Sequence, residues 1–373
     1  MPSKSPASLS AGQLLVIGFD GTAMSPQLAE MLTRVQPAGV ILFARNILNA
    51  QQTHKLLKDC QARVRAPLFT MVDLEGGRVD RFRNLTGPAP SAADVFATGN
   101  RKLYRKHGEI IGKACCAMGL NSDLAPVLDL AFEASRAVMS SRAFSTNPKD
   151  VVLYAREFLA GLRSARVIGC GKHFPGLGEG NLDSHHHLPL IRKPFKGLWE
   201  QDLVPYRVMK RELPMVLINH ANYPNVTRDK LPASLSKYWI TGVLRRKVGY
   251  RGLIVSDDLE MGGVLKAAPL EKAAIEFVRA GGDLCLICHE PAGIERAFAA
   301  MTREAERDAS FRRRATQSAK RISVFKRKHA KLLRIGPAPT EDKIARLSRQ
   351  LWEYSEQVRY SAMPGATAAG AGR

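Results

Sequence analysis

The chain has 373 residues, of which 45% are hydrophobic and 24% are charged. This composition fits one large α/β barrel or two modest domains, and it excludes a collagen-like or intrinsically disordered chain. The formal net charge of +22 raises the hypothesis of nucleic-acid binding, because dense Lys and Arg are typical of phosphate-binding surfaces.

The N-terminal residues and the hydropathy pattern indicate whether the protein is secreted or inserted in a membrane. The first apolar run is interrupted by Gly18 and Asp20, so it lacks the apolar core of a signal peptide. No uninterrupted apolar stretch approaches the roughly 20 residues that a membrane-spanning helix needs. We therefore expect a soluble, cytoplasmic protein with no membrane partner.

Short apolar runs alternate with helix-like segments along most of the chain. The segment that follows Asn147 and Pro148, for example, repeats its apolar residues at helical spacing. Strands that alternate with helices predict a parallel sheet, and eight such units match a single-domain (β/α)8 TIM-like barrel. An open doubly wound sheet is the structural alternative, but no strand is followed by a G-x-G-x-x-G turn. The eight predicted strands lie within residues 14–19, 39–44, 67–73, 122–130, 166–174, 215–221, 252–258 and 283–289.

Helical sequence follows the eighth predicted strand. The excess positive charge is concentrated in residues 311–334, which have an amphipathic pattern. We favour a solvated helix face over a nucleic-acid site because no RNA- or DNA-binding motif accompanies them. A second amphipathic stretch covers residues 341–360. We expect a catalytic barrel domain over residues 1–335, and a C-terminal helix with a disordered tail over residues 336–373.

Polar residues follow the predicted strands at the end where barrel enzymes place their chemistry. Three single residues have ordinary structural alternatives: Asp258 fits a helix cap better than catalysis, Asp129 fits a cap or turn as well as a site, and His220 fits a hydrogen-bonded core histidine as well. A purely structural role is harder to assign when polar residues occur together at the ends of several predicted strands. These residues are Asp73, Glu75, Arg78 and Arg81 after the third strand, Asp129 after the fourth, Lys172 and His173 at the fifth, Asn219 and His220 after the sixth, and Asp257, Asp258 and Glu260 at the seventh.

The loop after the fifth strand, within residues 171–190, is rich in His, Gly and Pro, which predicts a lid between stiff anchors. Asp183 and His185 lie two positions apart, so the carboxylate can orient the imidazole as a general acid/base near neutral pH. With Asp257 as nucleophile, the set fits retaining glycoside hydrolysis. A histidine in place of the usual second carboxylate departs from the general rule.

Six motifs carry a family resemblance. In chain order they are "DLEGGRVDR", "APVLDL", "SSRAFSTNP", "GKHFPGLGEGNLDSHHHLPLI", "PASLS" and "GLIVSDDLEM". The chain resembles the glycoside hydrolase family 3 β-N-acetylglucosaminidases of the NagZ type over residues 12–300. The resemblance implies a single (β/α)8 barrel that removes terminal β-linked N-acetylglucosamine from muropeptides during peptidoglycan recycling, or from chitooligosaccharides, with no metal and no cofactor.

The resemblance also implies roles for particular residues. Asp257 would be the nucleophile and His185 the acid/base, with Asp183 as its partner. The substrate-binding residues would be Asp73, Arg81, Arg142, Lys172 and His173. The chain departs from the family at Leu177, where the motif usually has a second histidine, and this bears on the position of the lid. His186 and His187 offer alternative imidazoles, and only the D-S-H pattern selects His185.

Other functions stay open at this point. A metal-dependent barrel hydrolase would need an H-x-H motif after the first strand, which ends in "FDGT" instead. Cys285 and Cys288 have zinc-knuckle spacing, but they lie in a predicted buried strand, and we expect reduced, buried thiols. A non-catalytic basic binding protein, and phosphorolysis in place of hydrolysis, are the remaining alternatives. We expect a monomer, because nothing in the sequence indicates an oligomer interface.

Overall fold

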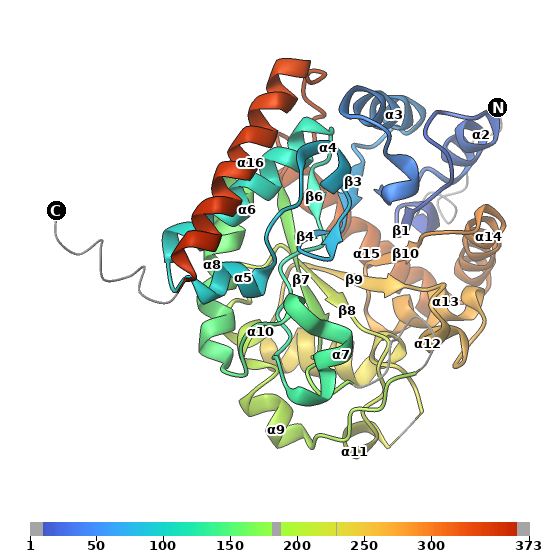
Figure 1. Ribbon diagram of the computed structural model, residues 1–373. Helices are drawn as coiled ribbons and strands as arrows, with labels where there is room; N and C mark the ends of the chain where they lie inside the picture. Colours follow the sequence, from blue (N-terminus) through green and yellow to red (C-terminus); the bar gives the residue numbers. More distant parts are fainter. Residues whose placement is uncertain (1–9, 181–187, 229, 364–373) are drawn as a thin grey trace.

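The computed structural model describes residues 10–180, 188–228 and 230–363, and it contains a closed parallel barrel (Figure 1). The strands follow one another around the barrel in the order β1-β10-β9-β8-β7-β6-β3-β2. Each begins inside one of the eight predicted runs, so the predicted (β/α)8 fold is confirmed. The strands are β1 Leu15–Ile17, β2 Gly39–Leu42, β3 Phe69–Val72, β6 Ser122–Asp123, β7 Ile168–Phe174, β8 Met215–Ile218, β9 Leu253–Asp258 and β10 Leu284–Ile287.

Helices surround the barrel, and the strands are buried because their outer faces pack against these helices. Helix α8 shows how the sequence sets a boundary: Pro148 is its first residue, and the Asn147 side chain accepts the N–H of Lys149. The longer helices are α2 Pro26–Val35, α3 Ala50–Arg63, α6 Arg101–Ala117, α8 Pro148–Ser164, the π-helical segment η5 Tyr238–Val248, α13 Leu270–Ala280, α14 Pro291–Arg307, α15 Ala309–Lys328 and α16 Glu341–Ser361.

Short elements lie in the connections between barrel strands. The hairpin formed by β4 Leu74–Gly76 and β5 Val79–Asp80 was not predicted from the sequence, and it follows β3 directly. The short helices are η1 Ala44–Asn46, α4 Arg83–Thr86, α5 Ala92–Ala97, η2 Glu133–Ser135, α7 Arg136–Met139, η3 Ser140–Arg142, α9 Phe195–Glu200, α10 Val204–Val208, α11 Pro224–Thr227, η4 Ala233–Leu235 and α12 Gly262–Leu265.

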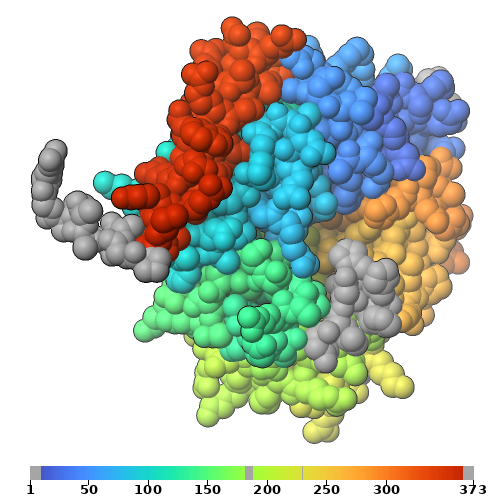
Figure 2. Space-filling model, in the orientation of Figure 1, coloured from blue at the N-terminus to red at the C-terminus, as the bar shows by residue number. Residues whose placement is uncertain are grey.

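Both predicted C-terminal helices are present, as α15 and α16. Figures 1 and 2 show α16, in red, lying along one side of the barrel against the segments that contain α4, α5 and α6. Its buried face includes Leu347, Leu351, Tyr354 and Val358. The predicted tail beyond residue 363 lies outside the described residues. Among the helices that are described, none is long and apolar enough to cross a membrane.

Replacing Tyr354 with alanine is expected to destabilise the fold by about 3–5 kcal/mol, the usual cost of truncating a large buried aromatic side chain. The Tyr354 ring is fully buried and stacks on His107, and its hydroxyl donates to the Leu103 carbonyl at 2.9 Å. Denaturant unfolding measures the change. Trp352 lies two residues away on the same helix with 64% of its surface exposed, so Trp352→Ala is the matched control, expected within about 0.5 kcal/mol of wild type. Equal losses would show that α16 is not held by its buried face.

Candidate active site

A cavity of about 220 Å³ lies at the carboxyl ends of the barrel strands. Asp183 and His185 lie outside the described residues, so their positions stay predictions. The other predicted site residues converge on this one cavity, which draws them from several strand ends separated widely in sequence. They are Asp73, Arg81, Arg142, Lys172, His173 and Asp257.

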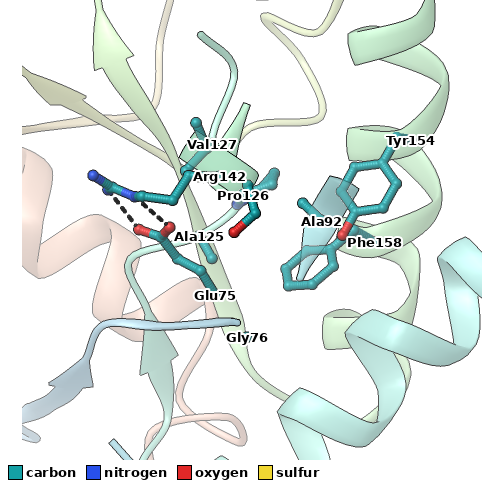
Figure 3. A pocket seen from close by; sticks show the side chains of 10 residues that line it. Glu75, Gly76, Ala92, Ala125, Pro126, Val127, Arg142, Tyr154 and Phe158 are labelled. Carbon is teal, nitrogen blue, oxygen red and sulfur yellow. Dashed lines mark hydrogen bonds and ion pairs between the residues drawn. The ribbon is translucent and has the colours of Figure 1, made fainter. Parts of the chain in front are cut away.

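Glu75, on the hairpin strand β4, joins two of the predicted cationic residues. Its Oε1 lies 2.6 Å from Nζ of Lys172. Arg142 donates hydrogen bonds to both carboxylate oxygens, from Nε at 2.7 Å and from Nη2 at 2.8 Å. Figure 3 shows this fork of Arg142 and Glu75 near the aromatic rings of Tyr154 and Phe158. A bidentate pair fixes the guanidinium plane, so Glu75 sets the orientation of Arg142 at the cavity.

Lys172 is buried in β7 and bonds a second carboxylate as well, Oδ1 of Asp73 at 2.6 Å. Burial alone would raise the pKa of the Glu75 carboxyl, but Arg142 and Lys172 outweigh it and hold that pKa well below its usual range. The pKa of Asp73 is lowered in the same way, against the effect of burial, by Lys172 and Arg81. Both carboxylates are therefore ionised at neutral pH. An ammonium group has three N–H donors, so Lys172 keeps one for a ligand.

His173 extends this network to the other side of the cavity. Its Nδ1 lies 2.6 Å from Oδ2 of Asp129, and its Nε2 lies 3.3 Å from Nη2 of Arg142. Because Arg142 can only donate, Nε2 accepts and Nδ1 carries the proton that is donated to Asp129. The hydrogen-bond partners thus assign one tautomer to the ring and fix its orientation.

Asp129 also anchors the start of the histidine loop. Its Oδ1 accepts the backbone N–H of Leu177 at 2.7 Å, and the Leu177 side chain is buried against the cavity. Asp129 therefore closes the turn expected for it, and it also bonds His173, which lines the cavity. Leu177, where the sequence departs from the family motif, makes an apolar contact with the cavity in this structure.

Asp257 and Asp258 end strand β9 and have different surroundings. Oδ1 of Asp257 accepts the backbone N–H of Asp258 at 3.0 Å, and Asp257 lines the cavity. Asp258 accepts the N–H of Glu260 at 3.1 Å, which closes a turn after β9; the predicted helix cap is wrong, because Met261 occupies the N-cap position of α12. His220 is a buried core histidine between the Ser234 hydroxyl and the Asp258 carbonyl, so its structural alternative is confirmed.

His289, after strand β10, lines the cavity and was not predicted as a site residue. Its Nε2 lies 3.2 Å from Oδ2 of Asp258, and its ring lies 5.5 Å from that of Phe43. The hydrogen bond to Asp258 raises the pKa of His289 above its ordinary value of 6.5, although burial and Arg45 oppose the shift. The only sequence signal was its place at the end of a predicted strand.

His289→Asn is expected to make the stability less dependent on pH between about pH 5 and pH 9. A group whose pKa is raised by folding contributes stability that is fully present below its unfolded pKa and is lost as pH rises through the folded pKa. The wild type should therefore exceed the variant below about pH 6.5, and the two should converge at alkaline pH. Urea unfolding across this range measures the difference. A difference that grows with pH would contradict the assignment of the pair.

A buried carboxyl group and two buried thiols lie outside the network described above. Asp123, in β6, is fully buried beneath the site, and burial raises the pKa of its carboxyl well above the usual range. Cys285 and Cys288 are buried thiols outside any disulfide. Over the described ranges, no group of three or more His, Cys, Asp or Glu side chains is arranged to hold a metal ion.

Comparisons with known proteins place this geometry in a family. Residues 8–322 match the glycosyl hydrolase family 3 N-terminal domain. The chain is 39% identical over 287 residues to a β-hexosaminidase of Alkalilimnicola ehrlichii, covering 75% of this chain and 82% of that protein. It is 30% identical over 355 residues to a β-hexosaminidase of Actinobacillus pleuropneumoniae, covering 92% of this chain and 99% of the relative.

A solved structure agrees with the sequence matches. The family 3 β-N-acetylglucosaminidase of Paenibacillus sp. superimposes with a TM-score of 0.85 at 30% identity, covering 95% of this chain and 69% of that one. The family match spans most of the chain and coincides with the closed barrel. The chain therefore belongs to glycosyl hydrolase family 3: it is a glycoside hydrolase, and its substrates are carbohydrates.

Proposed function

We propose that the chain is a retaining exo-β-N-acetylglucosaminidase. The observation that carries the proposal is the convergence of six predicted site residues on one cavity at the carboxyl ends of the strands. The names of the relatives support the class of substrate, since two are β-hexosaminidases and one is a β-N-acetylglucosaminidase. We infer that terminal β-linked N-acetylglucosamine is the sugar removed.

The proposed reaction has two displacements. The Asp257 carboxylate attacks the anomeric carbon, the bond from that carbon to the leaving oxygen breaks, and His185 gives its proton to that oxygen. Water then attacks the same carbon, its proton passes to His185, and the bond to Asp257 breaks. In this proposal Asp183 orients His185 and stabilises its charged form.

The remaining residues fit the binding of sugar hydroxyls. Asp73 keeps about a fifth of its side chain exposed, so it can accept hydroxyl protons at the cavity. Lys172 has one donor left after its two ion pairs. Arg142 and His173 are held in fixed orientations beside it. Arg81 completes the proposed set, and with Arg142 and Lys172 it forms a basic rim suited to sugar hydroxyls and an anionic leaving portion.

The finer statements rest on the family resemblance. We propose a muropeptide as the natural substrate, in peptidoglycan recycling, with a chitooligosaccharide as the alternative. We also propose a cytoplasmic monomer that needs no cofactor, with the catalytic domain over residues 1–335 and a C-terminal extension over residues 336–373.

Release of nitrophenol tests the proposed function. The wild-type protein is expected to cleave 4-nitrophenyl N-acetyl-β-D-glucosaminide far faster than 4-nitrophenyl β-D-glucoside, in the presence of a chelator and without phosphate. Rates that require phosphate and yield a sugar phosphate would make the protein a phosphorylase instead. A preference for the glucoside would overturn the proposed N-acetyl specificity.

A further inference from the structure

A second cavity lies at the opposite end of the barrel from the candidate active site. Its volume is about 590 Å³. It lies where α6 and α8 end, just before β6 and β7 begin, and the segment after α15 closes its other side. Because the helices run antiparallel to the strands, these helix ends lie at the amino-terminal end of the barrel. The candidate active site therefore plays no part in this cavity.

The side chains that line this cavity carry charge of one sign only. Arg166, Lys331, Arg334 and Lys343 line it and are exposed, and none of the described lining residues is acidic. Two helix carboxyl ends contribute roughly half a negative charge each. Four positive charges exceed the combined charge of about −1 at the two helix ends by about three. Stabilisation of the two helix carboxyl ends therefore does not account for all four cations.

A stripe on α15 continues this basic region. Arg313, Lys320 and Arg327 follow one another at intervals of seven residues, so they lie on one face of the helix over about 21 Å. All three are exposed, and the chain then leads directly to Lys331 and Arg334. From residue 309 to residue 334 the sequence contains no acidic residue. The stripe leads along the chain into the cavity lining, and we call the two together the basal groove.

Ion pairing distinguishes the basal-groove cations from Arg314 and Arg321 on the same helix. Arg314 and Arg321 face inward and pair with the buried carboxylate of Asp283 at the start of β10. By contrast, none of the seven basal-groove cations forms an ion pair with any residue that the structure describes. These are Arg166, Arg313, Lys320, Arg327, Lys331, Arg334 and Lys343.

We propose that the basal groove binds the phosphodiester backbone of a nucleic acid without regard to sequence. A linear row of unpaired cations that ends in a hollow fits a charged chain, whereas a flat membrane surface cannot enter the hollow. No aromatic side chain is among the described residues that line the cavity, so the groove offers no surface on which bases can stack. Contacts to phosphates therefore supply the binding. The sequence alone favoured a solvated helix face, because the hollow is visible only in the structure.

Fluorescence anisotropy with a labelled 30-base-pair DNA duplex of arbitrary sequence tests the proposal on the full chain. If about five of the cations contact phosphates, the logarithm of the association constant should fall with the logarithm of salt concentration with a slope of about −4.5. Raising salt from about 50 to about 200 mM should then weaken binding roughly 500-fold. A slope near zero would overturn the proposal.

A matched pair of fourfold variants locates the binding. The test variant replaces four groove cations with glutamine, and we expect it to bind at least about 100-fold more weakly at low salt and to lose about three to four units of the slope. The control variant removes the same charge at the other end of the barrel and should bind within about threefold of wild type. The test positions are Arg166, Lys331, Arg334 and Lys343, and the control positions are Arg192, Lys196, Lys230 and Lys237.

Two further measurements keep the result decisive. The charge-conserving pair Arg166→Lys and Arg334→Lys should retain binding, which ties the loss in the test variant to charge at these positions. Nitrophenol release should be unchanged in the test variant, because the groove lies away from the candidate active site. Equal weakening in test and control variants would overturn the proposal, as would cosedimentation with anionic phospholipid vesicles in the absence of duplex binding.

Discussion

Asp257→Ala is expected to lower kcat/KM for 4-nitrophenyl N-acetyl-β-D-glucosaminide by about 10⁴-fold or more, because loss of a covalent nucleophile removes the first displacement altogether. Asp257 is partly exposed and lines the cavity, and among the residues that the structure describes its carboxylate accepts only the neighbouring N–H of Asp258. A carboxylate free to face a ligand can attack an anomeric carbon. Steady-state kinetics at neutral pH measure the loss.

The adjacent carboxylate is the matched control for this prediction. Asp258 caps the turn after β9 and pairs with His289, so Asp258→Asn should cost no more than about tenfold in kcat/KM. Azide gives a further readout that a structural role would not produce. In Asp257→Gly, azide is small enough to occupy the space of the missing carboxylate, and a single displacement should give the α-glycosyl azide. Full activity in Asp257→Ala, or a greater loss in Asp258→Asn, would contradict the assignment.

The sequence predicted the barrel well because its signals are local. Most barrel strands are buried on both faces, so they lie in mainly apolar runs of sequence. Helix α8 was found from its Asn-Pro start, and α16 from one amphipathic stripe. The hairpin of β4 and β5 was missed because it is only a few residues long and its strands alternate no apolar pattern. Short, polar elements depend on their tertiary partners.

Most of the described site residues were predicted where a polar residue follows or ends a predicted strand. Asp73, Lys172 and Asp257 stand at strand ends, where a barrel places its chemistry. Glu75 was noted at a strand end but not selected, because its partner Arg142 lies 67 positions further along the chain. Asp123 and His289 were missed for the same reason, since their environments are built from distant strands. The roles of Asp183 and His185 stay predictions.

Glu75→Gln is expected to destabilise the fold by about 3–5 kcal/mol, the usual cost of removing one partner from a buried ion pair. Glutamine keeps the shape of the side chain, but its amide turns an N–H donor toward the guanidinium of Arg142, which can only donate. Glu212→Gln is the control, because Arg156 grips Glu212 with the same two nitrogens at 2.7 and 2.8 Å while both side chains are exposed. That exposed pair should be worth no more than about 1 kcal/mol.

The pH dependence of stability distinguishes the contribution of the Glu75 charge from that of its side-chain shape. Folding lowers the pKa of this carboxyl from its ordinary value of 4.5, so its contribution is present above that value and is lost as pH falls toward the folded pKa. The difference between wild type and Glu75→Gln should therefore be constant near neutral pH and shrink on acidification below about pH 4.5. Since Glu75 orients Arg142 and Lys172, kcat/KM should fall with it, while Glu212→Gln leaves kcat/KM unchanged. Equal destabilisation in the two variants would mean that burial adds nothing to this fork, and that the cavity is held by its backbone alone.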